Sequence, residues 1–357
     1  MTQVPTPRRR ARPTLADIAA DAGVSRATVS LVIRNVPTVA EGTRQRVMSS
    51  LSRLGYVYNR GAASLRSQRS HAVGLVVSDI TNPFFAELIV AIEDRLAAAG
   101  YITVFGNTSE RPEKQMRLLT RLAESAVDGI LICPTKGANS STEFALPNVP
   151  VVAFARTLPG VDYVGLDNRL GAALATKHLF RLGHHRIAFF GGFRELSSSQ
   201  ERLEGYLSAH QETGRTVTQE LIFSGPPTQA GGGQAVTQAL RLSTPPTAAL
   251  CFNDLVALGA TEALRSAGLE PPRFALVGYD NIGVGASVHP ALTTVDGVPA
   301  EVGKAAAELL LQRLNEPAST IQRRILEPRL IVRESCGAGH APERQEVHAV
   351  KNSRNAQ

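Results

Sequence analysis

Cysteine is scarce in this sequence, and its scarcity excludes the protein classes that depend on it. The 357 residues include three cysteines, Cys133, Cys251 and Cys336, and no two of them form a CxxC pair. An odd number of widely separated cysteines argues against a disulfide framework or a zinc site. The same scarcity suits a reducing cytoplasm.

Long apolar runs and catalytic signatures are missing as well. No run of about 18 apolar residues is present to span a bilayer, and the basic start MTQVPTPRRRARP is not followed by the apolar part of a signal peptide. No phosphate-binding glycine loop occurs, and no serine or cysteine stands in a nucleophile elbow. We expect a cytoplasmic protein that is no enzyme and uses no cofactor or metal, with residues 1–12 as a disordered basic arm.

Lysine is absent from the first 70 residues, where the basic charge is all arginine. Twelve arginines against three acidic residues give this segment a net charge of +9. Because the whole chain carries +7, the remaining residues carry −2. A positive charge concentrated in the first fifth of the chain indicates a polyanionic partner for that segment.

Residues 14–33 carry the signals of two short helices joined by a tight turn. Thr14 and Asp17 have the spacing of a capping box, and apolar residues follow at helical spacing up to Gly23, which ends the first helix. Ser25 is placed to cap the second. A third helix is expected from about Gly42 to Leu54. Three helices in this arrangement are the helix-turn-helix plan, over residues 13–58.

The second helix carries a leucine on the face where solvent is expected. Val29, Val32 and Ile33 form its buried stripe, whereas Leu31 lies on the opposite face with Ala27. A thymine methyl group in a DNA major groove would give Leu31 an apolar partner. The alternative is a scattered surface leucine, which is common in proteins.

Four segments, TLADIAADAGVSRATVSLVIRN, EGTRQRV, LGYVYN and NRGAASLRS, follow one another in this order. Together they resemble the lactose-repressor (LacI/GalR-type) family of bacterial transcriptional regulators. The resemblance implies that the second helix enters the major groove, with Arg26, Ala27 and Leu31 at its base-reading positions. Arg26 is suited to a bidentate pair with guanine, while the other two offer only apolar contacts.

The resemblance also implies a set of phosphate and groove-edge contacts. They are Thr14, Ser25, Thr28, Ser30, Asn35, Tyr56 and Asn59. Helix capping is an equal and compatible role for Thr14 and Ser25.

Residues 59–70 are small, polar and basic around one leucine, Leu65. Such a segment buries too little surface to fold alone, so it should be mobile without DNA. The resemblance implies that it becomes a hinge helix on the operator, where Leu65 wedges into the minor groove and kinks the duplex. The alternative is a flexible linker with an incidental leucine.

From residue 71 to about 335, apolar runs alternate with amphipathic helices. Strands are expected at 73–77, 102–105, 129–133, 149–153, 186–190, 248–252 and 275–278, and helices at 84–99, 114–124, 168–181, 199–212, 228–240 and 255–266. This alternation predicts an α/β core of two doubly wound parallel-sheet lobes. The resemblance implies a core like that of periplasmic sugar-binding proteins, with crossings between lobes near Asp167 and Leu292 and with the stretch after Val298 completing the first lobe.

Polar and aromatic residues follow the predicted strands, where ligands bind in such sheets. Carboxylates, amides and arginine suit the hydroxyls of a sugar, and a phenylalanine ring can cover its apolar face. Matching the family gives Phe84, Arg202, Asn253 and Asp280 as the first effector candidates, with Asp79, Asn107, Arg156 and Asp167 next. Asp79 and Asp167 have helix capping as an alternative role, and Arg202 has a surface position.

The expected function is that of a sequence-specific transcriptional repressor whose operator affinity is controlled by a small effector, a sugar. Residues 336–357 are polar and carry no leucine heptad, so we expect a disordered tail and a homodimer on a near-palindromic operator. A solute-binding protein would instead carry a signal peptide and no basic first domain. An enzyme would carry a nucleophile or a cofactor loop, and a nonspecific DNA-architectural protein would not need a cleft.

Overall fold

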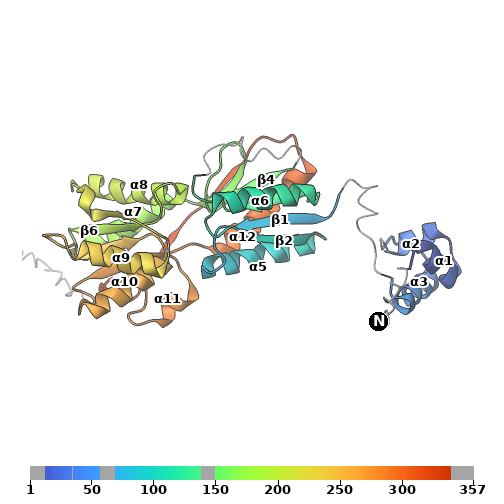
Figure 1. Ribbon diagram of the computed structural model, residues 1–357, viewed down its shortest axis with the longest axis horizontal. Coiled ribbons are helices and arrows are strands. Elements are labelled where there is room, and N and C mark those ends of the chain that lie inside the picture. The colour runs from blue at the N-terminus through green and yellow to red at the C-terminus, as the bar shows by residue number, and fades with distance from the viewer. Residues whose placement is uncertain (1–12, 34, 57–68, 138–148, 339–357) are drawn as a thin grey trace, which may run out of the picture. The chain divides into compact units, whose positions relative to one another are not determined.

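The structure, a computed structural model of the chain, describes residues 13–33, 35–56, 69–137 and 149–338. The chain divides into two compact units, Met1–Ser70 and His71–Gln357 (Figure 1). The predicted N-terminal arm, most of the hinge with Asn59 and Leu65, and most of the tail lie outside the described residues. Within the described ranges, no helix is long and apolar enough to cross a membrane.

The first unit consists of helices α1 (Leu15–Ala22), α2 (Arg26–Ile33) and α3 (Glu41–Leu54). The predicted capping box is confirmed, because the Thr14 backbone N–H donates to Asp17 Oδ2 at 2.7 Å and the Asp17 N–H donates to Thr14 Oγ1 at 3.4 Å. Gly23 and Gly55 end α1 and α3 with φ of 66° and 63°, which favours glycine. Local signals therefore fix the limits of these helices.

Side chains from all three helices meet in a small apolar core. Ile18, Val29 and Val47, one from each helix, have no exposed surface. Asp21 on α1 accepts hydrogen bonds from Ser50 and Arg53 on α3, which joins the two helices at the rim of this core. The unit is thus folded on contacts of its own.

The second unit contains two lobes, each built on a six-stranded sheet. The first lobe contains β1 (Ala72–Val77), α5 (Pro83–Ala98), β2 (Ile102–Asn107), α6 (Pro112–Glu124), β3 (Gly129–Ile132), β4 (Val151–Phe154), β5 (Asp162–Leu166), α12 (Pro299–Asn315) and β11 (Arg323–Leu326). The second contains α7 (Asn168–Arg181), β6 (Ile187–Gly191), α8 (Ser197–Glu212), η2 (Gln219–Leu221), β7 (Ile222–Ser224), α9 (Gln229–Ala239), β8 (Ala248–Cys251), α10 (Asp254–Ser266), β9 (Ala275–Asp280), α11 (Gly283–Ser287), β10 (Thr294–Asp296) and β12 (Arg329–Ile331).

Strand order confirms the doubly wound arrangement. The sheets run β11-β5-β4-β3-β1-β2 and β12-β10-β9-β8-β6-β7. The paired strands are parallel except β10 and β12, which pair antiparallel at the edge of the second sheet. The carboxyl ends of the parallel strands therefore gather at one edge of each sheet.

The chain passes between the lobes three times. The first passage, after β5 at Asp167, lies where the resemblance placed it. The second was expected near Leu292, and this is wrong: Leu292 is buried in the core of the second lobe, and β10 still pairs with β9. The chain leaves only after Asp296, and α12 then completes the first lobe as expected. A third passage, between β11 and β12, was not predicted.

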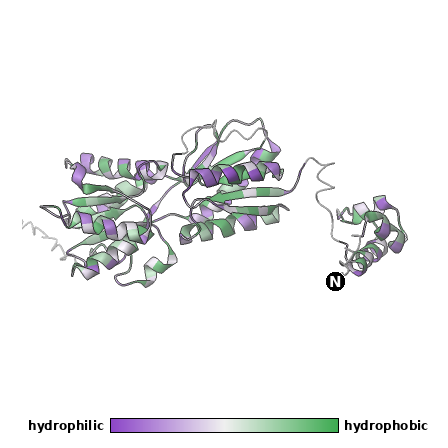
Figure 2. Ribbon diagram, viewed as in Figure 1, coloured by the Kyte–Doolittle hydropathy of each residue, from purple (hydrophilic) through white to green (hydrophobic). Residues whose placement is uncertain are grey.

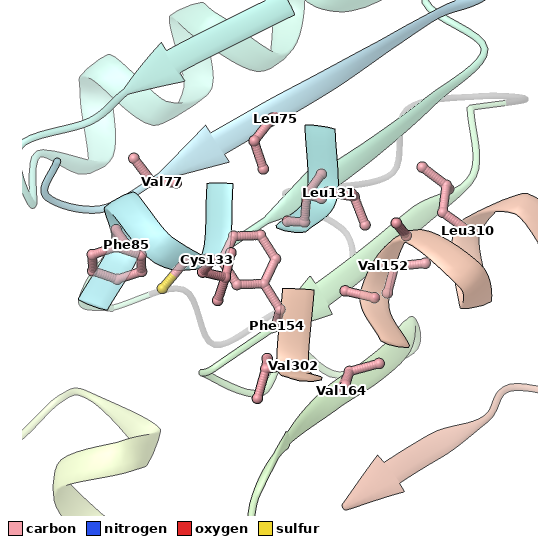
Figure 3. Packing of buried hydrophobic residues seen from close by; sticks show 14 of the residues in the cluster. Leu75, Val77, Phe85, Leu131, Cys133, Val152, Phe154, Val164, Val302 and Leu310 are labelled. Carbon is pink, nitrogen blue, oxygen red and sulfur yellow. The ribbon is translucent and has the colours of Figure 1, made fainter. Parts of the chain in front are cut away.

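Alternating side chains of β1 face two different helix layers. Leu75 and Val77 point into a core shared with Phe85 of α5 and Val302 of α12 (Figure 3). Val76 points to the other side, into a cluster with residues of α6. A strand that is covered on both faces must be apolar throughout, as β1 is, whereas the visible face of α6 is hydrophilic (Figure 2).

Two glycines bring the backbones of α9 and α10 into direct contact. A Cβ atom at Gly232 would lie 2.0 Å from the Val256 carbonyl oxygen, and one at Gly259 would lie 1.8 Å from the Gln229 carbonyl oxygen. Neither position can carry a side chain unless the helices separate. At Gly233, one residue along α9, the nearest atom would be 3.8 Å away. The two glycines therefore set how closely the two helices pack.

These glycines give a matched pair of substitutions. Gly259→Ala should lower the free energy of unfolding of the second unit by about 1–3 kcal/mol, because the new methyl group overpacks the helix contact. Gly233→Ala should raise it by about 0.5–1 kcal/mol, because alanine favours the helix and the space is free. Urea unfolding of both variants checks this, and equal effects would contradict the close contact.

Candidate effector site and DNA-reading surface

A cavity of about 50 Å³ lies between the lobes, at the carboxyl ends of their strands. The first lobe contributes residues that follow β1, β2 and β4, and the second contributes residues that follow β8, end β9 and begin α7 and α8. Polar and aromatic side chains lining it include Ser78, Asp79, Asn82, Phe84, Glu110, Arg156, Asn168, Ser198, Arg202, Phe252, Asn253 and Asp280. This is the position where doubly wound sheets bind ligands.

Arg202, on α8, is buried in the cavity wall with its guanidinium held on several sides. Its Nε donates to Asn168 Oδ1 at 2.9 Å, and its NH1 donates to the carbonyl oxygen of Phe252. The guanidinium carbon lies 3.5 Å from the centre of the Tyr279 ring, where cation–π attraction favours the buried charge. These contacts fix the direction in which the remaining donors point.

Asp280 ends β9 and faces both Arg202 and the opposite lobe. One carboxylate oxygen lies 3.9 Å from Arg202 NH2, and the other accepts a hydrogen bond from Asn82 Nδ2 at 3.1 Å. Burial raises the pKa of Asp280 to about 6, although Arg202 and Asn82 act in the opposite direction. Its φ of 114° lies where residues other than glycine are rare, so the surrounding contacts must hold it there.

Arg156 follows β4, and a carboxylate of the same lobe neutralises its charge. It forms a bidentate pair with Glu110, with distances of 2.7 and 3.0 Å to the two carboxylate oxygens. Its NH1 also donates to the Pro134 carbonyl oxygen at 3.0 Å. A guanidinium engaged in this way offers little free charge to an anionic ligand.

Asn253 and Asp254 connect the cavity to the core of the second lobe. Asn253 caps α10 by accepting the Val256 N–H at 2.9 Å. Asp254 is fully buried and accepts hydrogen bonds from Thr294 Oγ1 at 2.6 Å and from the Ile282 N–H at 2.8 Å. Burial and the nearby Asp280 carboxylate raise the pKa of Asp254 to about 8.

The structure brings six of the eight predicted effector candidates to the cavity: Asp79, Phe84, Arg156, Arg202, Asn253 and Asp280. The other two are not among the lining residues. Asn107 accepts the Ile80 N–H at 3.3 Å, and Asp167 caps α7 by accepting the Leu170 N–H at 2.9 Å. For Asp167 the capping role is therefore the observed one.

Sequence reasoning missed Glu110 and Asn168 as lining residues. Strand β2 continues to Asn107, two residues beyond the predicted end, so the loop that reaches the cavity begins later and presents Glu110. Asn168 stands beside the predicted Asp167, but it is the first residue of α7 and faces Arg202. The sequence shows that both stretches are polar, but it does not show which single residue of each stretch lines the cavity.

The proposed DNA-reading residues occupy the first unit. Arg26 and Ala27 are exposed on α2, and Leu31 is half-buried. Ser25 accepts the Thr28 N–H at 3.1 Å and so caps α2 as expected. Asn35 Oδ1 accepts a hydrogen bond from Arg44 NH1 at 2.8 Å, and Tyr56 packs against the helix core. Ser30 is half-buried on α2.

Comparisons with known proteins agree with this architecture. Residues 14–59 match the bacterial regulatory proteins of the lacI family, and residues 176–336 match a periplasmic binding protein-like domain. The HTH-type transcriptional regulator GalR of Escherichia coli K12 is 34% identical over 327 residues, covering 90% of this chain and 95% of that protein. The HTH-type transcriptional repressor PurR of Actinobacillus pleuropneumoniae serotype 5b is 35% identical over 329 residues, covering 90% and 98%.

Solved structures show the same relationship. The complex of the transcriptional regulator CelR with cellobiose is 32% identical, with a TM-score of 0.69 and coverage of 91% of this chain and 100% of that chain. The lac repressor dimer bound to operator and the anti-inducer ONPF is 26% identical, with a TM-score of 0.81 and coverage of 91% and 99%.

A helix-turn-helix unit joined to a two-lobed α/β core defines a DNA-binding transcriptional regulator with an effector domain. The chain belongs to the lacI family of bacterial regulatory proteins.

The buried carboxyl of Asp254 gives a prediction about pH. Its raised pKa means that the folded chain holds the proton more tightly than the unfolded chain, so the resulting stability is fully present below about pH 4 and is lost as pH rises through 8. Asp254→Asn imitates the protonated carboxyl. We expect this variant to exceed the wild type in free energy of unfolding at pH 8, and the excess to shrink toward pH 5.

Urea unfolding between pH 5 and pH 8.5 measures this difference. Asp94→Asn, on an exposed position of α5, is the control and should follow the wild type at every pH. A pH-independent gap between Asp254→Asn and the wild type would show that Asp254 is already ionised across the range.

Proposed function

We propose that this regulator is a repressor that binds a near-palindromic operator as a homodimer and that a sugar in the cavity between the lobes controls its operator affinity. The observation that carries the proposal is a cavity lined by carboxylates, amides and arginines from both lobes, on a chain that also carries a DNA-reading unit. The CelR relative was solved with cellobiose, which supports a sugar as the effector class.

In this proposal, α2 enters the major groove. Arg26 is exposed and uncommitted to the helix core, which suits a bidentate contact to guanine. Ala27 and Leu31 present apolar surface beside it, and Leu31 is not part of the core cluster formed by the described residues. Thr14, Ser25, Thr28, Ser30, Asn35, Tyr56, Asn59 and Leu65 complete the proposed DNA contacts, the last two from outside the described residues.

We propose that two copies associate through the apolar edge of the first lobe. Ile102 and Phe105 of the edge strand β2 are 54% and 43% exposed, and Val90 of the neighbouring α5 is 60% exposed. An exposed apolar edge strand favours association with another chain. A symmetric dimer through this edge would present two reading units to two half-sites.

The effector must distinguish two arrangements of the lobes in order to act. A ligand shifts an equilibrium only by its difference in affinity for the two states. The cavity walls come from both lobes, so a sugar that contacts Arg202 and Asp280 on one side and Asp79 and Arg156 on the other binds best at one separation of the lobes. Because of that preference, binding of the sugar changes the affinity of the protein for DNA, either upward or downward. We propose that the protein acts in the cytoplasm, on nucleoid DNA.

Genomic footprinting with the purified chain tests the proposal. We expect protected sites with two symmetric half-sites, and an occupancy that changes when one sugar of a panel is added. Binding without a preferred symmetric site would contradict specific regulation. Occupancy that no sugar of the panel changes would contradict the effector class.

Three variants sharpen this experiment. Phe105→Asp, in the apolar edge, should abolish protection of paired half-sites, whereas Val284→Asp, at an equally exposed apolar residue of α11, should leave it intact. Arg26→Ala should relax the preference at one base pair in each half-site by about 1–3 kcal/mol. If discrimination is unchanged, Arg26 contacts a phosphate instead.

A further inference from the structure

The far end of α2, the proposed reading helix, packs incompletely against α3. Val29 and Val32 of α2 are buried in the core of the first unit. Past these residues, a hollow of about 360 Å³ lies between the two helices. Its lining residues are Val32, Ile33, Asn35, Arg44, Met48, Leu51 and Tyr56. Because a hollow forfeits the dispersion contacts of packed side chains, packing holds this end of α2 less firmly than its middle.

A left-handed residue, Asn35, ends α2. The Asn35 N–H donates to the Val32 carbonyl oxygen at 2.9 Å, and the Val36 N–H donates to the Leu31 carbonyl oxygen at 3.0 Å. These two bonds form the Schellman motif, whose left-handed position is usually taken by glycine. Asn35 occupies it with φ of 54°, a conformation that asparagine tolerates better than most residues. The sequence therefore places an amide side chain at the exposed end of α2.

Arg44 of α3 binds both residues of this helix stop. Its NH1 donates to Asn35 Oδ1 at 2.8 Å, and its NH2 donates to the Val36 carbonyl oxygen at 2.8 Å. The Arg44 side chain is 20% exposed, and its Nε lies 3.9 Å from Glu41 Oε2. Because both donors belong to one planar guanidinium, they fix the two acceptors relative to each other and to α3. A lysine ammonium, which acts as a point charge, does not reproduce this geometry.

The contact with Arg44 decides how the Asn35 amide is turned. A guanidinium carries donors only, so Asn35 must present its oxygen to Arg44. The Nδ2 group is then turned away from the guanidinium, and no residue that the structure describes accepts a hydrogen bond from it. An exposed amide donor at the end of a reading helix suits a phosphate oxygen of DNA.

We propose that Arg44 is a positioning residue for DNA binding, which turns the Asn35 amide so that Nδ2 donates to a phosphate beside the groove that α2 enters. The inference rests on the proposed function, in which Asn35 belongs to the DNA contacts, and adds the residue that orients this contact. Arg44 acts through Asn35 and not by its own charge. Because phosphate contacts fix the orientation of a protein on the duplex, the pair helps to set how α2 presents Arg26.

Fluorescence anisotropy titrations of the full-length protein test the Asn35 contact. The probes are two labelled duplexes: the sequence that the wild type selects from a randomised library, and the same sequence with both half-sites scrambled. Asn35→Asp keeps the shape of the side chain and pairs with Arg44, but its carboxylate repels a phosphate instead of donating to it. We expect this variant to stay folded and to bind the selected duplex about tenfold or more weakly.

Asn35→Gly keeps the left-handed stop and removes the amide. It should weaken binding to the selected duplex by about threefold to tenfold, the loss of one hydrogen bond, with a smaller effect on the scrambled duplex.

Arg44→Lys tests the positioning role, because it keeps the positive charge but does not bridge two acceptors. We expect it to weaken binding to the selected duplex about as much as Asn35→Gly does. The salt dependence of binding should stay unchanged, since no charge is lost. In the Asn35→Gly background, Arg44→Lys should cost about twofold at most, because the amide that it orients is gone.

Arg46→Lys is the matched control for Arg44→Lys. Arg46 is exposed on the same helix, and its NH2 donates to Thr43 Oγ1 within α3 at 3.4 Å. This variant should leave the affinity for both duplexes unchanged. Amide hydrogen exchange of α1 and α3 shows whether the first unit of each variant is folded. If Arg44→Lys does not fold, Asn35→Asp still tests the contact, because it keeps the guanidinium in place.

The outcomes separate the positioning role from the proposed function. Wild-type affinity of Arg44→Lys for the selected duplex would overturn the positioning role and show that Arg44 acts by its charge. Losses that multiply in the double variant would show that Arg44 does not act through Asn35. Wild-type affinity of Asn35→Asp would overturn the phosphate contact and leave a sequence-specific regulator standing. Selection of no preferred duplex would overturn both the inference and the proposed function.

Discussion

The hydrogen bond from Asn82 to Asp280 joins the two lobes at the floor of the cavity, and the site is arranged around it. Asn82 also caps α5 by accepting the Phe84 N–H. One amide side chain therefore caps a helix of the first lobe and donates a hydrogen bond to the second lobe. Asp280 is held in turn by Arg202, and burial together with the Asp280 charge raises the pKa of the neighbouring Asp254. A change in lobe separation therefore acts on a connected polar network rather than on one contact.

Much of the fold could be predicted because its signals are local. Thr14 with Asp17, and Gly23 and Gly55 with φ above 60°, define helix ends within a few residues of sequence. The apolar runs of β1, β3 and β8 are buried on both faces and stand out in the sequence. The edge strands β7, β11 and β12 are short and partly exposed and were not predicted, and neither was β5, although all five of its residues are buried. The misplaced crossing at Leu292 has the same origin, since β10 has only three residues.

The site was less predictable than the fold, because the paths of the loops decide which residues line a cavity. Arg202 and Asp280 were found by matching family positions, and their mutual contact follows from the tertiary structure alone. Asp167 and Asn168 are neighbours with opposite roles, a cap and a cavity residue, and composition does not separate them.

The central claim, that the lobe junction controls the DNA-reading unit, is tested most directly by the operator affinity of Asn82→Ser without any sugar. Serine keeps the cap on α5 but is too short to reach Asp280. The account predicts a severalfold change in affinity for the specific operator, with nonspecific DNA binding unchanged, although residue 82 lies in the effector unit. An operator affinity equal to that of the wild type would contradict it.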